Sequence, residues 1–167
     1  MNNRAVEATL YYVRLKTHRS SQLFGSSENV SENECIETAQ LPSATLSKAA
    51  FSKIVADELL FAADQRGIAL DQWVVVPDAV HALAFVREYR PTPDLGTGKP
   101  RQLTSFVAAF KAATAKRINL MRNQPGSSVW QRSYNEQRVE DEFMLNRLRR
   151  KITDATDVIV SSQRLSP

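Results

Sequence analysis

The pattern of hydrophobic and polar positions predicts three strands in the first half of the chain. Residues 8–16 (ATLYYVRLK) are rich in β-forming side chains and alternate in part, which is typical of a strand. Residues 68–76 and 80–87 predict two more strands, because both are apolar runs that meet at a Pro77-Asp78 turn.

Three other segments carry apolar residues at helical spacing. The first opens at residues 42–45 (PSAT) and should end near Arg66, because Gly67 favours a helix stop. The second covers residues 101–122, where the basic side chains lie largely outside the apolar stripe. The third runs from Glu140 to about Thr153.

The remaining segments predict loops and two short strands. Residues 18–44 are rich in Ser, Glu and Asn and predict a long polar loop, and residues 89–100 hold three prolines and two glycines. Short strands are expected at 129–130 and 157–160. The order predicts an α+β fold, a ferredoxin-like split β-α-β sandwich whose antiparallel sheet carries its helices on one face. Residues 1–156 form the expected domain, and 157–167 a final strand with a mobile tail.

Composition excludes several classes of protein. The chain has 167 residues, of which 43% are hydrophobic, and this is enough for one domain with a core. It has neither an apolar run of about eighteen residues nor a secretion signal, so we expect no membrane partner. Cys35 is the single cysteine, which excludes a disulfide framework and favours the cytoplasm.

Basic charge is concentrated in the second half of the chain. Residues 1–98 carry nine Lys and Arg against twelve Asp and Glu, whereas residues 99–151 carry twelve against four, a net charge of +8 for that segment. Such a segment could attract phosphate groups. The alternative is an ordinary solvated helical surface.

One histidine lies in the strand that follows the Pro-Asp turn. Alternate residues of a strand point to the same face, so Ala79 and His81 share one face. Two histidines at this spacing could hold one divalent ion, but only the second position is a histidine here. A lone histidine in an apolar strand is more often a core or surface residue than a metal ligand.

Four motifs together resemble a known family. They are residues 11–24 (YYVRLKTHRSSQLF), residues 77–81 (PDAVH), residues 110–112 (FKA) and residues 130–136 (WQRSYNE). In this order they resemble the single-tyrosine HUH transposases, most closely the REP-associated branch, over roughly residues 8–156. In that family the second motif reads Pro-Asn/Asp-His-x-His.

The resemblance implies a metal-dependent cleavage chemistry that we expect this chain to have lost. In the family, two histidines and one polar residue hold Mg²⁺ or Mn²⁺, and a tyrosine on the last helix attacks a DNA phosphate. The two histidine positions correspond to Ala79 and His81, the tyrosine to Lys151 and the polar ligand to Ala155. The chain is therefore expected to be a catalytically silent relative in which His81 is a relic, with no cofactor unless activity is retained.

Binding of hairpin or single-stranded DNA could outlast the chemistry, because it needs cations and aromatic faces rather than a metal. RNA is a further candidate ligand, and the resemblance implies a homodimer. Two alternatives stay open: a scaffold with a protein partner, and an active transposase or nuclease with a non-standard site. The candidate binding residues are Arg14, Lys16, Arg19, Lys111, Lys116, Arg117, Arg122, Arg132, Tyr134, Arg138, Arg147, Arg150 and Lys151.

Overall fold

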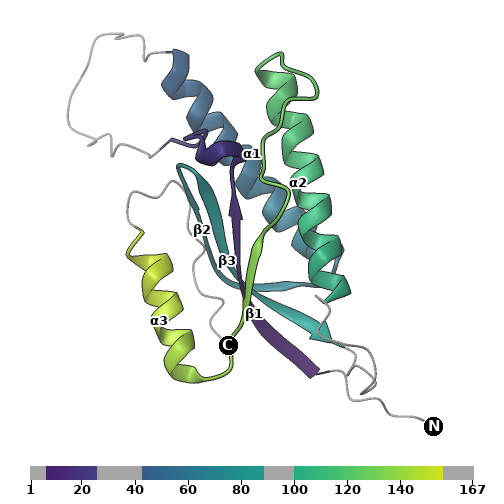
Figure 1. Ribbon diagram of the computed structural model, residues 1–167, viewed down its shortest axis with the longest axis vertical. Coiled ribbons are helices and arrows are strands. Elements are labelled where there is room, and N and C mark those ends of the chain that lie inside the picture. Colours follow the sequence, from purple (N-terminus) through teal and green to yellow (C-terminus); the bar gives the residue numbers. More distant parts are fainter. Residues whose placement is uncertain (1–6, 26–42, 89–99, 156–167) are drawn as a thin grey trace.

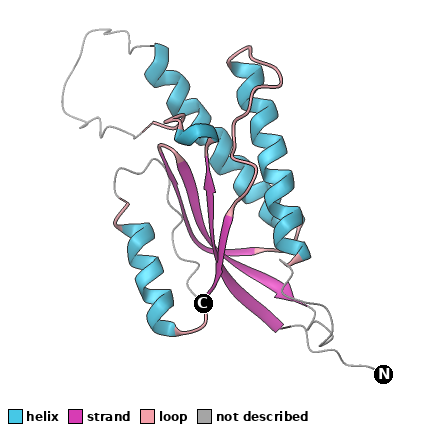
Figure 2. Cartoon of the chain, in the orientation of Figure 1, coloured by secondary structure: helices cyan, strands magenta, loops and turns pink. Residues whose placement is uncertain are grey.

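The computed structural model describes residues 7–25, 43–88 and 100–155, which form four strands and three α-helices (Figures 1 and 2). The elements are β1 (Glu7–Lys16), a short 3-10 helix η1 (His18–Ser20), α1 (Ser43–Gln65), β2 (Ala69–Val76), β3 (Ala79–Glu88), α2 (Arg101–Met121), β4 (Asn135–Arg138) and α3 (Glu142–Thr153). None of these helices has the length and apolar character that crossing a lipid bilayer requires.

The strands form one antiparallel sheet in the order β2-β3-β1-β4. Pro77 and Asp78 join β2 to β3 as a tight hairpin, in which Val76 pairs with Ala79. The central strands β1 and β3 pair along their whole lengths, and this register sets Arg14 opposite His81. The predicted α+β class and antiparallel sheet are confirmed.

Helices cover both faces of the sheet, so the expectation of helices on one face is wrong for α3. Tyr11, Val13 and Leu15 of β1 pack with α1 and α2, whereas Leu10 and Tyr12 pack with α3. The physical reason is that β1 is apolar on both sides over much of its length, so each face buries a helix. We call the side that α3 covers the α3 face.

The predicted helix stop at Gly67 is confirmed, and Trp130 is a buried residue of the core on the side of the sheet that α1 and α2 cover. The Trp130 indole is buried against Phe24 and Phe110, and its Nε1–H donates to the Thr114 hydroxyl at 2.7 Å. Gly67 adopts a φ of +61°, the left-handed conformation that ends a helix after Gln65 at little steric cost.

The fourth strand differs from the prediction. The expected strand at 129–130 is a single bridge between Thr17 and Trp130, and pairing resumes only at β4. The β4 sequence NEQR contains no β-forming side chain, so its strand conformation comes from the free edge of β1 rather than from propensity. The last helix begins at Glu142, because the Asp141 carboxylate accepts from the Met144 amide at 2.6 Å and caps it.

Several predictions fall partly or wholly outside the described residues. Of the loop predicted at 18–44, residues 18–20 form η1 and Phe24 is buried in the core, while residues 26–42 are not described. The proline-rich loop is not described at 89–99, and neither is the strand expected at 157–160.

Candidate nucleic-acid interface

His81 lies on the α3 face near the β2-β3 hairpin and is almost completely buried. Its imidazole is 9% exposed, and its Nδ1 is 2.5 Å from the Tyr12 hydroxyl. Tyr12 is on the neighbouring strand β1, two residues from Arg14, so its side chain points to the same face. His81 therefore has a hydrogen-bond partner within the fold.

The surroundings of His81 disfavour its charged form. Burial lowers the pKa of His81 from its ordinary value of 6.5 to about 4, and the positive charges of Arg14, Lys151 and Lys16 act in the same direction. The Asp78 carboxylate opposes this shift. The imidazole is consequently neutral at pH 7, in a locally positive environment.

The residues at the other implied ligand positions are parts of apolar packing. Ala79 has no exposed surface, and Ala155 packs against the cluster between α3 and the sheet. Neither side chain has an atom that could bind a cation. Within the described ranges, no group of three His, Cys, Asp or Glu residues could hold a metal ion. The residues present thus do not fit the metal site that the sequence resemblance implies.

Lys151 and His81 are far apart in sequence but lie close together on the α3 face. The Lys151 ammonium is 5.4 Å from the centre of the Tyr12 ring, and its charge contributes to the lowered pKa of His81. Lys151 stands where the family has its tyrosine, and it therefore lies next to Tyr12, as His81 does. Burial raises the pKa of the Tyr12 hydroxyl, although Arg14 opposes the shift, so this phenol is protonated at pH 7.

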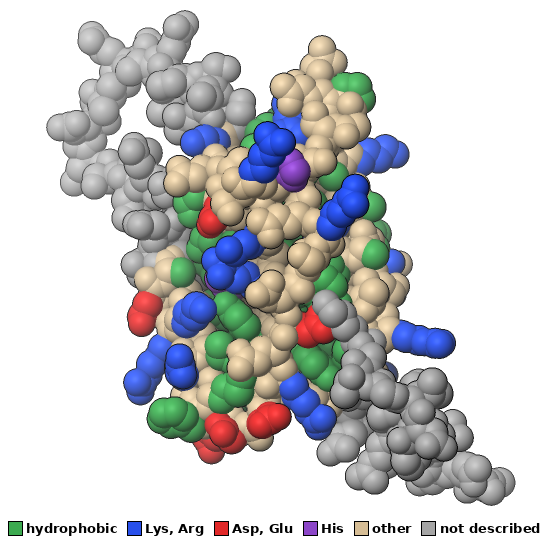
Figure 3. Space-filling view, viewed as in Figure 1, with side chains coloured by type: hydrophobic (Ala, Val, Ile, Leu, Met, Phe, Trp, Pro, Cys, Tyr) green, Lys and Arg blue, Asp and Glu red, His purple; other side chains and the backbone are tan. Residues whose placement is uncertain are grey.

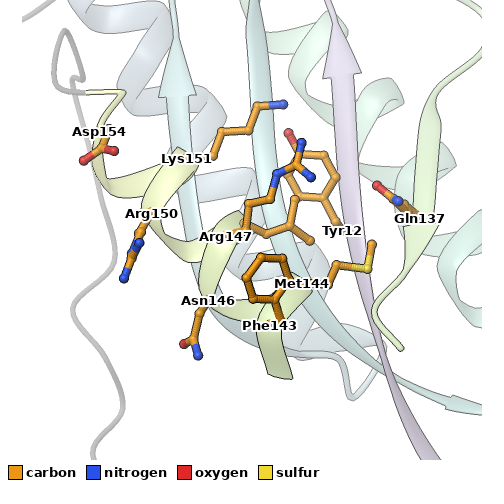
Figure 4. A pocket seen from close by; sticks show the side chains of 10 residues that line it. Tyr12, Gln137, Phe143, Met144, Asn146, Arg147, Arg150, Lys151 and Asp154 are labelled. Carbon is orange, nitrogen blue, oxygen red and sulfur yellow. The ribbon is translucent and has the colours of Figure 1, made fainter. Parts of the chain in front are cut away.

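A pocket of about 670 Å³ opens beside Tyr12, along α3 (Figure 4). Figure 4 shows Lys151 and Arg147 on the side of the helix toward Tyr12, while Arg150 and Asn146 point away from it. The lining residues are Tyr12, Gln137, Phe143, Met144, Asn146, Arg147, Leu148, Arg150, Lys151 and Asp154. The pocket combines cations with apolar and aromatic walls.

The α3 face gathers five of the predicted binding cations, which we call the α3-face cations. They are Arg14, Lys16, Arg147, Arg150 and Lys151. Figure 3, in which α3 lies at the lower left, shows Lys and Arg side chains across the upper and middle part of this side, with hydrophobic side chains between them. The buried Nε of Arg14 has no hydrogen-bond partner among the described residues. Arg149 instead forms a bidentate ion pair with Asp71 of β2, which ties α3 to the sheet.

The cations of α2 lie on the opposite layer, and three of them already have partners. The Lys111 ammonium donates to the carbonyls of residues 131, 132 and 133 at 2.7, 3.3 and 3.1 Å, so it organises the chain around the Trp-Gln motif. Arg117 pairs with Glu58 at 2.8 Å, and Arg122 donates to Asn119. Lys116 is exposed. These residues therefore lie on the other side of the sheet from the α3-face cations.

The other four candidates lie around the edges of the sheet. Arg19 is exposed in η1, and Arg132 is exposed just after Gln131, whose amide donates to the Lys16 carbonyl. Arg138 is exposed at the end of β4. Tyr134 is half-buried with its hydroxyl 3.3 Å from that of Thr104, which indicates packing.

Sequence reasoning missed two residues of this site. Tyr12 reads as one of several β-forming residues, and only the pairing of β1 with β3 brings it to His81. Phe143 is 80% exposed at the mouth of the pocket. A signal for it was available, since Phe143 lies outside the apolar stripe of Met144, Leu145, Leu148 and Ile152.

Comparisons with known proteins find similar structures but no matching family or curated protein. No protein-family model matches the sequence, and no curated protein matches it. A candidate transposase from Deinococcus radiodurans R1 is similar with 21% identity and a TM-score of 0.49, over 93% of this chain and 96% of that one. A REP-associated tyrosine transposase bound to a REP hairpin is similar with 13% identity and a TM-score of 0.45, over 91% and 67%.

Proposed function

We propose that this protein binds hairpin or single-stranded DNA on its α3 face and does not cleave it by a metal-and-tyrosine mechanism. The position of Lys151 carries the proposal, because its ammonium lies over Tyr12 and close to His81. The sequence motifs imply that a DNA phosphate would be held at this place. A cation there supports phosphate binding and supplies no nucleophile comparable to a tyrosine.

The charge around Lys151 supports the same proposal. Three of the α3-face cations, Arg147, Arg150 and Lys151, line a pocket that also exposes aromatic and apolar surface. Cations of this kind bind nucleic acid by neutralising backbone phosphates and releasing counterions, so affinity falls steeply as salt rises. Since RNA carries the same phosphates, an RNA hairpin belongs among the probes.

The test is fluorescence anisotropy with a labelled DNA hairpin that carries a single-stranded tail, at two salt concentrations and with or without Mn²⁺. We expect salt-sensitive binding that does not depend on the metal. Lys151→Gln should weaken binding, and Lys116→Gln is the matched control, because it removes one exposed charge from the opposite layer. No binding at low salt, or equal losses in the two variants, would overturn the proposal.

One observation favours a second candidate, an active enzyme in which Tyr12 is the nucleophile. The Tyr12 hydroxyl contacts His81, as a nucleophile contacts its base. Against it, burial holds the phenol protonated and leaves it only 7% exposed. A covalent protein–DNA adduct that disappears in Tyr12→Phe would establish this candidate, and its absence across Mn²⁺ concentrations would exclude it.

A homodimer, a protein partner and a cytoplasmic location stay predictions. Sedimentation velocity measures the first. Pull-down after nuclease treatment tests for a protein partner. This experiment comes next if no nucleic-acid probe binds.

A further inference from the structure

Phe143 is the most exposed aromatic side chain among the described residues. It is 80% exposed, and it follows the Glu142 residue that opens α3. An exposed phenylalanine by itself needs no functional explanation, because folded proteins leave much apolar surface in water. The significance of Phe143 comes from the side chains that accompany it.

Phe143 stands at one end of a row of cations on the pocket side of α3. Residues four apart lie on the same side of a helix, so Phe143, Arg147 and Lys151 form a line, and all three border the pocket beside Tyr12 (Figure 4). At about 1.5 Å per residue this line is about 12 Å long. Beyond Lys151, on the sheet, the positive charge continues through Arg14 and Lys16.

Phe61 offers a useful contrast. It is 61% exposed on α1, which packs on the other face of the sheet. Its neighbours one helical turn away are Asp57, Glu58, Asp64 and Gln65, so no cation stands beside it on its own helix. Of these two exposed phenylalanines, Phe143 alone is followed by cations along its helix.

We propose that Phe143 is a stacking platform for an unpaired nucleobase, whose flanking phosphates lie along Arg147 and Lys151. This inference rests on the proposed function and specifies the ligand as single-stranded nucleic acid, because a base in a duplex already stacks on both faces. Phosphates of a stacked strand are about 3.4 Å apart along the axis, so the row is long enough for roughly three. The acidic residues 140–142 lie at the Phe143 end of the row. Because they repel phosphate, the strand should run from Phe143 toward Lys151 and not in the opposite direction, over residues 140–142.

The experiment measures anisotropy with two labelled probes of equal length and charge, an oligothymidylate and its abasic analogue, which lacks bases. Stacking of a base on an aromatic side chain predicts that Phe143→Ala loses roughly 5- to 150-fold in affinity for oligothymidylate and little for the abasic probe. Phe143→Trp should keep the affinity. Phe61→Ala is the matched control and should change neither.

Different results separate the failure of this inference from that of the proposed function. If Phe143→Ala binds oligothymidylate like the parent while Lys151→Gln does not, phosphate binding stands and the stacking role is overturned. An equal loss on both probes also overturns it, because the abasic probe has nothing to stack. If the parent binds the tailed hairpin but neither of these probes, the stacking role alone is overturned. If it binds none of the three at low salt, both proposals fail. Thermal unfolding of each variant checks the fold, which an 80% exposed side chain should not affect.

Discussion

Acid should destabilise this protein through His81, and the effect can be isolated with one substitution. The folded state holds the imidazole neutral with a pKa of about 4, whereas an unfolded chain takes up the proton near the ordinary pKa of 6.5. Between these values the unfolded state binds more protons, so the free energy of unfolding falls as pH falls. The contribution of His81 is therefore fully present above pH 6.5 and is lost toward pH 4.

The magnitude follows from the two pKa values. Linkage gives a loss of about 2 kcal/mol between pH 7 and pH 5, which grows to about 3 kcal/mol near pH 4. His81→Gln removes only the histidine part, because the amide does not titrate and can still hydrogen-bond to the Tyr12 hydroxyl.

The assay is urea unfolding of the parent and His81→Gln at pH 7 and pH 5. We expect the parent to lose about 2 kcal/mol more than the variant over this interval. In parallel, NMR should show the His81 ring resonances unchanged between these two pH values. Equal losses in the two proteins, or a His81 titration near pH 6.5 in the folded state, would refute the reasoning about burial and charge.

Three further predictions concern binding and stability. Lys151→Gln should lower the salt dependence of single-stranded DNA binding by about 0.7 in the slope of log K against log salt, in an anisotropy titration; an unchanged slope would contradict phosphate contact. In a double-mutant cycle, Arg149→Ala and Asp71→Ala should show a coupling of about 1 kcal/mol in urea unfolding, because their ion pair is bidentate and partly buried; additive effects would mean that the pair contributes nothing. Trp130→Ala should cost about 3–5 kcal/mol of unfolding free energy by calorimetry, and a loss below about 1 kcal/mol would show that Trp130 is not a core anchor.

The sequence by itself determined the elements whose signals are local. Alternation of apolar residues and turn chemistry were enough to predict β1, β2 and β3. The end of α1 at Gly67 was also predictable, because its φ is one that glycine adopts readily. These features depend on neighbours in the chain, so a linear pattern contains them.

Tertiary structure alone decided the composition of the site. β4 is polar and becomes a strand only because β1 offers an unpaired edge, and nothing in the apolar stripe of α3 says which face of the sheet it will cover. That choice separates the cations of α2 from the α3-face cations and sets Lys151 over Tyr12. A sequence records how many charges a segment carries, whereas the field at a site depends on which layers bring those charges together.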